Sequence, residues 1–90
     1  MEYVISFKTT SVAIKAEQCL LEQNLNVRVM PLPPQIRAGC GISLRIMGDE
    51  LTSARRVLED NNVCDVQIHS RQRENGKYVY LEYQEGIRRA

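Results

Sequence analysis

Residues 31–46 read PLPPQIRAGCGISLRI, and the predicted fold can be built outward from this stretch. Its three prolines fix their own φ angles and restrain the residues before them, so they favour an extended loop. Over residues 41–47, apolar side chains alternate with Ser43 and Arg45, which is the two-residue period of a half-buried strand with these two outward. The stretch therefore predicts a stiff loop between two strands, with Cys40 where the second strand begins.

Upstream of the loop, the pattern predicts a strand, a helix and a second strand. Residues 3–8 alternate with Tyr3, Ile5 and Phe7 on one side. The hydroxyl-bearing residues that follow are candidate helix N-caps: Thr9, Thr10 and Ser11. The next apolar residues share one helical stripe: Val12, Ala13, Ala16, Cys19 and Leu20. A short strand over residues 27–32 then leads into the loop.

Downstream of the loop, a second helix and a hairpin are predicted. The helical stripe consists of Leu51, Ala54, Val57 and Leu58, and a strand follows over residues 63–70. Asn75-Gly76 is a strong two-residue hairpin signal. A tight turn there gathers two tyrosines and two arginines on one face: Tyr78, Tyr80, Arg71 and Arg73.

The order of the elements predicts the α+β class, as a ferredoxin-like βαββαβ two-layer sandwich with an added C-terminal β-hairpin strand. In this fold the first four strands take the order 4-1-3-2, with both helices on one face. Ninety residues suit one domain, and we expect it to span residues 1–85, with 86–90 as a loose C-terminal tail.

Composition narrows the classes of partner. A net charge of +1 gives no support for nucleic acid or a membrane surface as a partner, and no apolar run approaches the roughly 18 residues of a membrane span. Three cysteines without paired spacing favour free thiols in a reducing cytoplasm. One histidine, without a CxxC or HxxxH motif, gives no basis for a metal site, and no cofactor is expected.

Cys40 is the candidate functional residue. Gly39 and Gly41 allow a close backbone approach or a positive φ, and they leave the thiol without neighbouring side-chain cover. The expected topology places Cys40 near the start of the first helix, whose positive end favours a thiolate and lowers its pKa. Arg37 would add positive charge, and the hydroxyls of Thr9, Thr10 and Ser11 would donate hydrogen bonds. The alternative is that Cys40 is a small structural residue in a tight turn.

Other chemically active residues give weaker signals. Cys19 lies on the predicted buried stripe, and Cys64 begins the fourth strand too far from Cys40 for a ready disulfide. His69 reads as a solvated residue opposite Glu82 on the hairpin, so general acid–base chemistry beside Cys40 lacks its parts. The tyrosine–arginine face favours a dimer interface over single-stranded RNA.

The T-T-S start of the first helix, the proline-rich loop and the AGCGISL segment at residues 38–44 together resemble a small bacterial domain family of selenium/sulfur carrier-like proteins. The resemblance covers about residues 2–68, and its most specific element is the Cys-Gly pair, which corresponds to Cys40 and Gly41. It implies a carrier role in sulfur or selenium metabolism, with donor and acceptor proteins as partners.

Three functions follow from these observations. The first is a sulfur or selenium carrier that uses Cys40 as a persulfide-type acceptor thiol, which is closer to an accessory protein than to an independent enzyme. The second is a non-catalytic binding or dimerisation module in which Cys40 is structural and the partner is a second copy or another molecule. The third, ranked last, is a single-stranded RNA binder.

Overall fold

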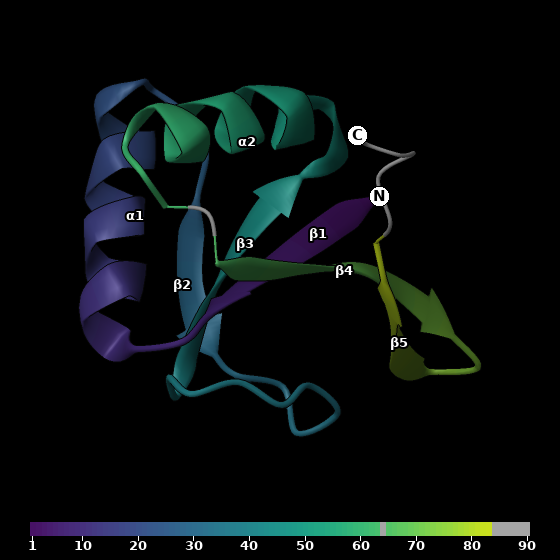
Figure 1. Cartoon of the computed structure of the whole chain (residues 1–90). Helices are drawn as coiled ribbons and strands as arrows, with labels where there is room; N and C mark the ends of the chain where they lie inside the picture. The colour runs from purple at the N-terminus through teal and green to yellow at the C-terminus, as the bar shows by residue number, and fades with distance from the viewer. Residues whose placement is uncertain (64, 84–90) are drawn as a thin grey trace, which may run out of the picture.

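The computed structural model describes residues 1–63 and 65–83 as an α+β fold, with two helices and a five-stranded antiparallel sheet (Figure 1). The elements are β1 (Glu2–Phe7), α1 (Thr10–Glu22), β2 (Arg28–Pro31), β3 (Ile42–Met47), the 3-10 turn η1 (Gly48–Glu50), α2 (Leu51–Asp60), β4 (Val66–Glu74) and β5 (Lys77–Glu82). The strands lie in the order β2-β3-β1-β4-β5. Seen from β4, the first four therefore read β4-β1-β3-β2.

Several predicted boundaries need correction. β2 is shorter than residues 27–32, and β4 begins at Val66 and continues to Glu74 rather than spanning 63–70. The predicted domain end at residue 85, the tail at 86–90 and the placement of Cys64 lie outside the described residues. Among the described residues, neither helix has the length and apolar character needed to cross a membrane.

Helix α1 begins because Thr9 caps it. Thr9 has an extended backbone, and its hydroxyl accepts a hydrogen bond from the N–H of Val12 at 3.2 Å, which satisfies one of the unpaired donors of the first turn. Ala13 and Ala16 are buried on the stripe that the sequence predicts. Cys19, expected in the core, is partly exposed instead.

The main core lies between the helices and one face of the sheet. Its buried side chains come from the central strands and both helices, among them Ile5, Phe7, Leu44, Ile46, Ile68, Leu20, Ala54 and Leu58. Alternation along each strand sends these side chains to the helical layer. One apolar layer thus holds the helices to the sheet.

The opposite face of the sheet is also covered at its centre. Ser6 and Ser43 pair across β1 and β3 and point away from the helices, as expected for Ser43, yet they are only 1% and 0% exposed. The proline loop, residues 32–41, passes on this side of the sheet (Figure 1), and its Ile36 is 3% exposed. We infer that this loop covers the two serines and Val4.

The β4–β5 hairpin has the predicted turn and register. Asn75 and Gly76 both have positive φ, at 53° and 79°, as a two-residue type I′ turn requires. The observed pairs include Arg73 with Tyr78, Arg71 with Tyr80, and His69 with Glu82. The predicted register and the predicted tyrosine–arginine face are therefore confirmed.

Candidate functional site around Cys40

The backbone of Cys40 lies at the junction between β1 and α1. Its N–H donates a hydrogen bond to the carbonyl of Phe7 at 3.3 Å. Gly39 is packed closely against the backbone of Lys8, which follows Phe7. A Cβ built on Gly39 would lie 1.9 Å from the carbonyl oxygen of Lys8. Since Thr9 follows as the N-cap of α1, the expected proximity of Cys40 to this helix start is found.

The two flanking glycines have different roles. Gly39 is required by the close backbone approach, as predicted. Gly41 has no positive φ, and a Cβ built on it would meet no atom within 4 Å, so the expectation of a special backbone role there is wrong. Gly41 has room for a side chain.

The sulfur of Cys40 turns into the core instead of toward solvent. Cys40 is 2% exposed and belongs to the same buried cluster as Phe7 and Ala13. Its Sγ donates a hydrogen bond to the carbonyl of Ile42 at 2.7 Å. The expectation of an open thiol is therefore wrong for this conformation, because the glycines uncover the backbone but not the sulfur.

The predicted supporting residues are not gathered around the sulfur. Arg37, Thr10 and Ser11 are exposed, and the hydroxyl of Thr9 is engaged with α1. The hydrogen-bond partner of the Cys40 thiol is a carbonyl oxygen and not one of these hydroxyls. In this state the site is a closed one, held by Gly39 and the backbone of β1 and β3.

A recess next to this loop end was missed by sequence reasoning. It has a volume of about 210 Å³ and is lined by Ser6, Phe7, Lys8, Ala38, Gly39, Asp65, Val66 and Gln67. At its rim Lys8 and Asp65 form an ion pair at 3.1 Å, with both side chains largely exposed. No local pattern signals this pair, because its members come from distant segments that only the sheet brings together.

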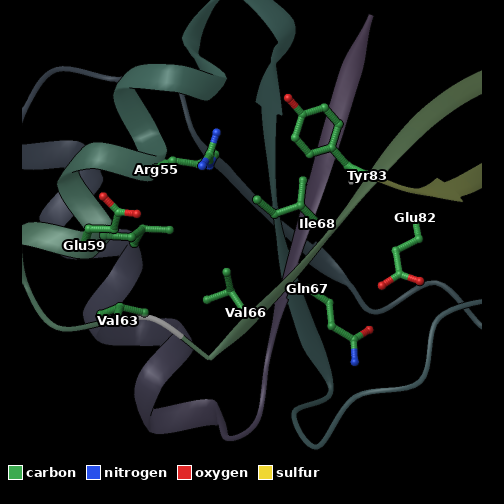
Figure 2. Close-up of a pocket in the computed structure, with 9 residues that line it drawn as sticks. Arg55, Glu59, Val63, Val66, Gln67, Ile68, Glu82 and Tyr83 are labelled. Carbon is green, nitrogen blue, oxygen red and sulfur yellow. The ribbon is translucent and has the colours of Figure 1, made fainter. Parts of the chain in front are cut away.

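A second pocket lies between α2 and the start of β4 (Figure 2). Val66 and Ile68 point into it from the strand, Arg55 and Glu59 lie on the helical side, and Tyr83 closes one end. Its volume is about 240 Å³. Cys40 does not line this pocket, so it is separate from the candidate thiol site.

On the sheet face opposite the helices, charged and aromatic side chains form a network. The carboxylate of Glu2 accepts hydrogen bonds from Arg45 and Arg71, each at 3.1 Å. The Arg71 guanidinium lies 3.8 Å from the ring centre of Tyr78, and that of Arg73 lies 5.6 Å from it. The hairpin register predicts the arginine–tyrosine part, whereas Glu2 was missed.

Within residues 1–63 and 65–83, no group of three histidine, cysteine or acidic side chains could hold a metal ion. Cys19 and Cys40 are both free thiols. The chemistry that the described residues offer around Cys40 is therefore that of a single sheltered thiol.

Comparison with known proteins gives one finding. Neither the curated proteins nor the solved structures contain a match to the chain. A family model described as "Putative Se/S carrier protein-like" matches residues 2–70, a range that includes the proline loop, Cys40 and both helices. Because this match spans well over half of the sequence, the chain belongs to the Se/S carrier-like family.

Proposed function

We propose that the protein carries sulfur, or selenium in the same chemical form, on Cys40. The observation that carries this proposal is the family match over residues 2–70, which contains the loop that holds the thiol. Support also comes from the simplicity of the site, since a carrier needs a nucleophilic thiol and a docking surface while its partners supply the remaining chemistry. We also propose that the fold is ferredoxin-like, with β5 as an added strand.

The transfer step balances without an external oxidant. The Cys40 thiolate attacks the terminal sulfur of a donor persulfide, a new S–S bond forms on Cys40, and the donor leaves as its thiolate after its own S–S bond breaks. An acceptor thiol then repeats the attack on the terminal sulfur of the Cys40 persulfide. Free thiols such as Cys19 and Cys40 suit a reducing compartment, and we place the reaction in the cytoplasm.

The buried sulfur sets a condition on this role. Attack on a donor requires Cys40 to leave the core, so residues 39–41 must separate from β1 during loading. The contacts that hold the thiol in place include the hydrogen bond from the Cys40 N–H to Phe7, the one from the thiol to Ile42, and the packing of the Cys40 side chain in the apolar core. Loop opening therefore precedes sulfur transfer.

The same burial favours a second candidate, a binding or assembly module in which Cys40 is a core residue. A small free cysteine packed among apolar side chains and hydrogen-bonded to a carbonyl is a common structural arrangement. This candidate predicts a thiol that reacts only when the whole protein unfolds.

Sulfur loading distinguishes the two candidates. Reduced protein is incubated with a cysteine desulfurase and cysteine, and its intact mass is measured. The carrier predicts a gain of one sulfur atom that Cys40→Ser abolishes and that the matched control Cys19→Ser retains. An unchanged mass, together with alkylation of Cys40 only at the rate of global unfolding, supports the structural module and contradicts the carrier. Loading that depends on Cys19 contradicts the assignment to Cys40.

A further inference from the structure

A groove lies between the proline loop and the β4–β5 hairpin, on the side of the sheet opposite the helices. Met30 and residues 31–35 line one side, while residues 76–78 and Tyr80 line the other, around a volume of about 540 Å³. β2 and β5 are the two edge strands of the sheet. The groove between their ends forms because the β4–β5 hairpin curls toward the proline loop (Figure 1). We call it the proline–tyrosine groove.

The groove combines rigid apolar walls with a cationic rim. Prolines and tyrosines lose little conformational freedom when a partner binds, and tyrosine is enriched among the residues that dominate binding energy. Tyr78 is 42% exposed. Arg73 shares the face of Tyr78, with its guanidinium 5.6 Å from the ring centre, and Lys77, which pairs with Glu74 across the hairpin, lines the groove at its turn end. These charges favour a partner that carries carboxylates beside apolar side chains.

We propose that this groove binds an extended acidic segment of the protein that exchanges sulfur with Cys40, an inference that rests on the proposed function. The groove and the thiol belong to one loop, because the N–H of Leu32 donates to the carbonyl of Gly41 at 3.0 Å and closes the base of that loop. A segment seated on residues 31–35 therefore contacts the loop whose far end holds Cys40. Docking at the groove and opening at Cys40 therefore act on the same loop.

Two other occupants fit less well. One face of the Tyr78 ring is covered by the Arg71 guanidinium, which lies 3.8 Å from the ring centre, so a nucleic-acid base cannot stack on that face. A second copy related by two-fold symmetry would place the same basic rim on both sides of the interface, which like-charge repulsion opposes.

The test measures fluorescence anisotropy of a short fluorescein-labelled peptide of alternating glutamate and leucine, titrated with the reduced wild-type protein. We expect binding that weakens as salt rises, with at least about a tenfold loss of affinity in Tyr78→Ala and in Arg73→Glu. Leu81→Ala, on the other face of β5, and Arg56→Glu, on α2, are matched controls that should bind as wild type does. Circular dichroism confirms that each variant is folded.

Absence of peptide binding, equal loss in the control variants, binding of oligouridine in place of the peptide, or a dimer that Tyr78→Ala dissociates would each overturn the proposal. Inorganic polysulfide separates this inference from the carrier role, since it loads a thiol without a docking protein. Tyr78→Ala should load from polysulfide as wild type does but more slowly from a cysteine desulfurase. If wild type loads from neither source, the carrier role fails. The peptide titration still tests whether the groove binds an acidic segment.

Discussion

Gly39 and Gly41 flank the same cysteine, yet they should respond differently to a methyl group. In Gly39→Ala the new Cβ would lie 1.9 Å from the backbone oxygen of Lys8, so the loop end must move away from β1. We expect a loss of about 2 kcal/mol in the free energy of unfolding, measured by urea denaturation, and faster alkylation of Cys40.

Gly41→Ala is the matched control. Its Cβ meets no atom within 4 Å, and the φ angle is not positive, so alanine mainly restricts the unfolded chain. The free energy of unfolding should rise slightly, by less than about 1 kcal/mol. Equal destabilisation by the two substitutions would show that the close approach of Gly39 to Lys8 is not a constraint on the loop.

At this scale the sequence predicts roles that depend on neighbours along the chain and fails for those that depend on distant contacts. Thr9 is a cap because its hydroxyl reaches an N–H within its own turn, and the pattern TTS signals this directly. The direction of the Cys40 sulfur depends on how the loop end packs onto β1. A flanking glycine pattern has no information about that packing, so exposure of the thiol could not be predicted.

The proline loop is the element on which both proposals depend, and Ile36 anchors it. The side chain is 3% exposed, and the N–H of Ile36 donates to the carbonyl of Pro33 at 3.0 Å in a tight turn. Ile36→Ala should lower the free energy of unfolding by about 2–3 kcal/mol in urea denaturation because it leaves a cavity under the loop. It should also speed alkylation of Cys40 in the folded protein, because the loop is held less firmly.

Ile14→Ala removes the same atoms from a side chain that is 51% exposed on α1. Its effect on the free energy of unfolding should stay within about 0.5 kcal/mol, and Cys40 alkylation should be unchanged. A loop that is anchored elsewhere would instead show the same Cys40 alkylation rate in both isoleucine variants.

Across the whole molecule, Glu2 connects three neighbouring strands at the centre of the sheet. Its carboxylate on β1 bonds to Arg45 on β3 and to Arg71 on β4, and these side chains are 28%, 30% and 12% exposed. Glu2→Gln leaves two guanidinium groups without their shared anion. We expect a loss of about 1 kcal/mol in the free energy of unfolding, smaller at high salt because screening weakens the charge interactions.

Asp65→Asn provides the comparison, because the Lys8–Asp65 pair is 74% and 78% exposed. Solvent already screens this pair, so its loss should change the free energy of unfolding by less than about 0.5 kcal/mol. The two substitutions are compared by urea denaturation at low and high salt. A larger effect from Asp65→Asn would contradict the central role of the Glu2 network.

The strand alternation, the hairpin register and the α+β class were predictable because each follows from short-range periodicity. The covering of Ser6 and Ser43 was not, since it arises when the proline loop folds over the face that alternation marks as polar. The groove has the same origin, because it brings together Pro33 and Tyr78 from opposite edges of the sheet. Long-range placement of loops accounts for these differences.

The inward orientation of the Cys40 sulfur also determines which thiol is oxidised first during storage in air. Peroxide oxidises thiols that it can reach, so the partly exposed Cys19 should acquire sulfenic acid or a mixed disulfide with glutathione before Cys40 does. In stored protein, Cys40 would thus stay reduced while Cys19 on α1 becomes oxidised.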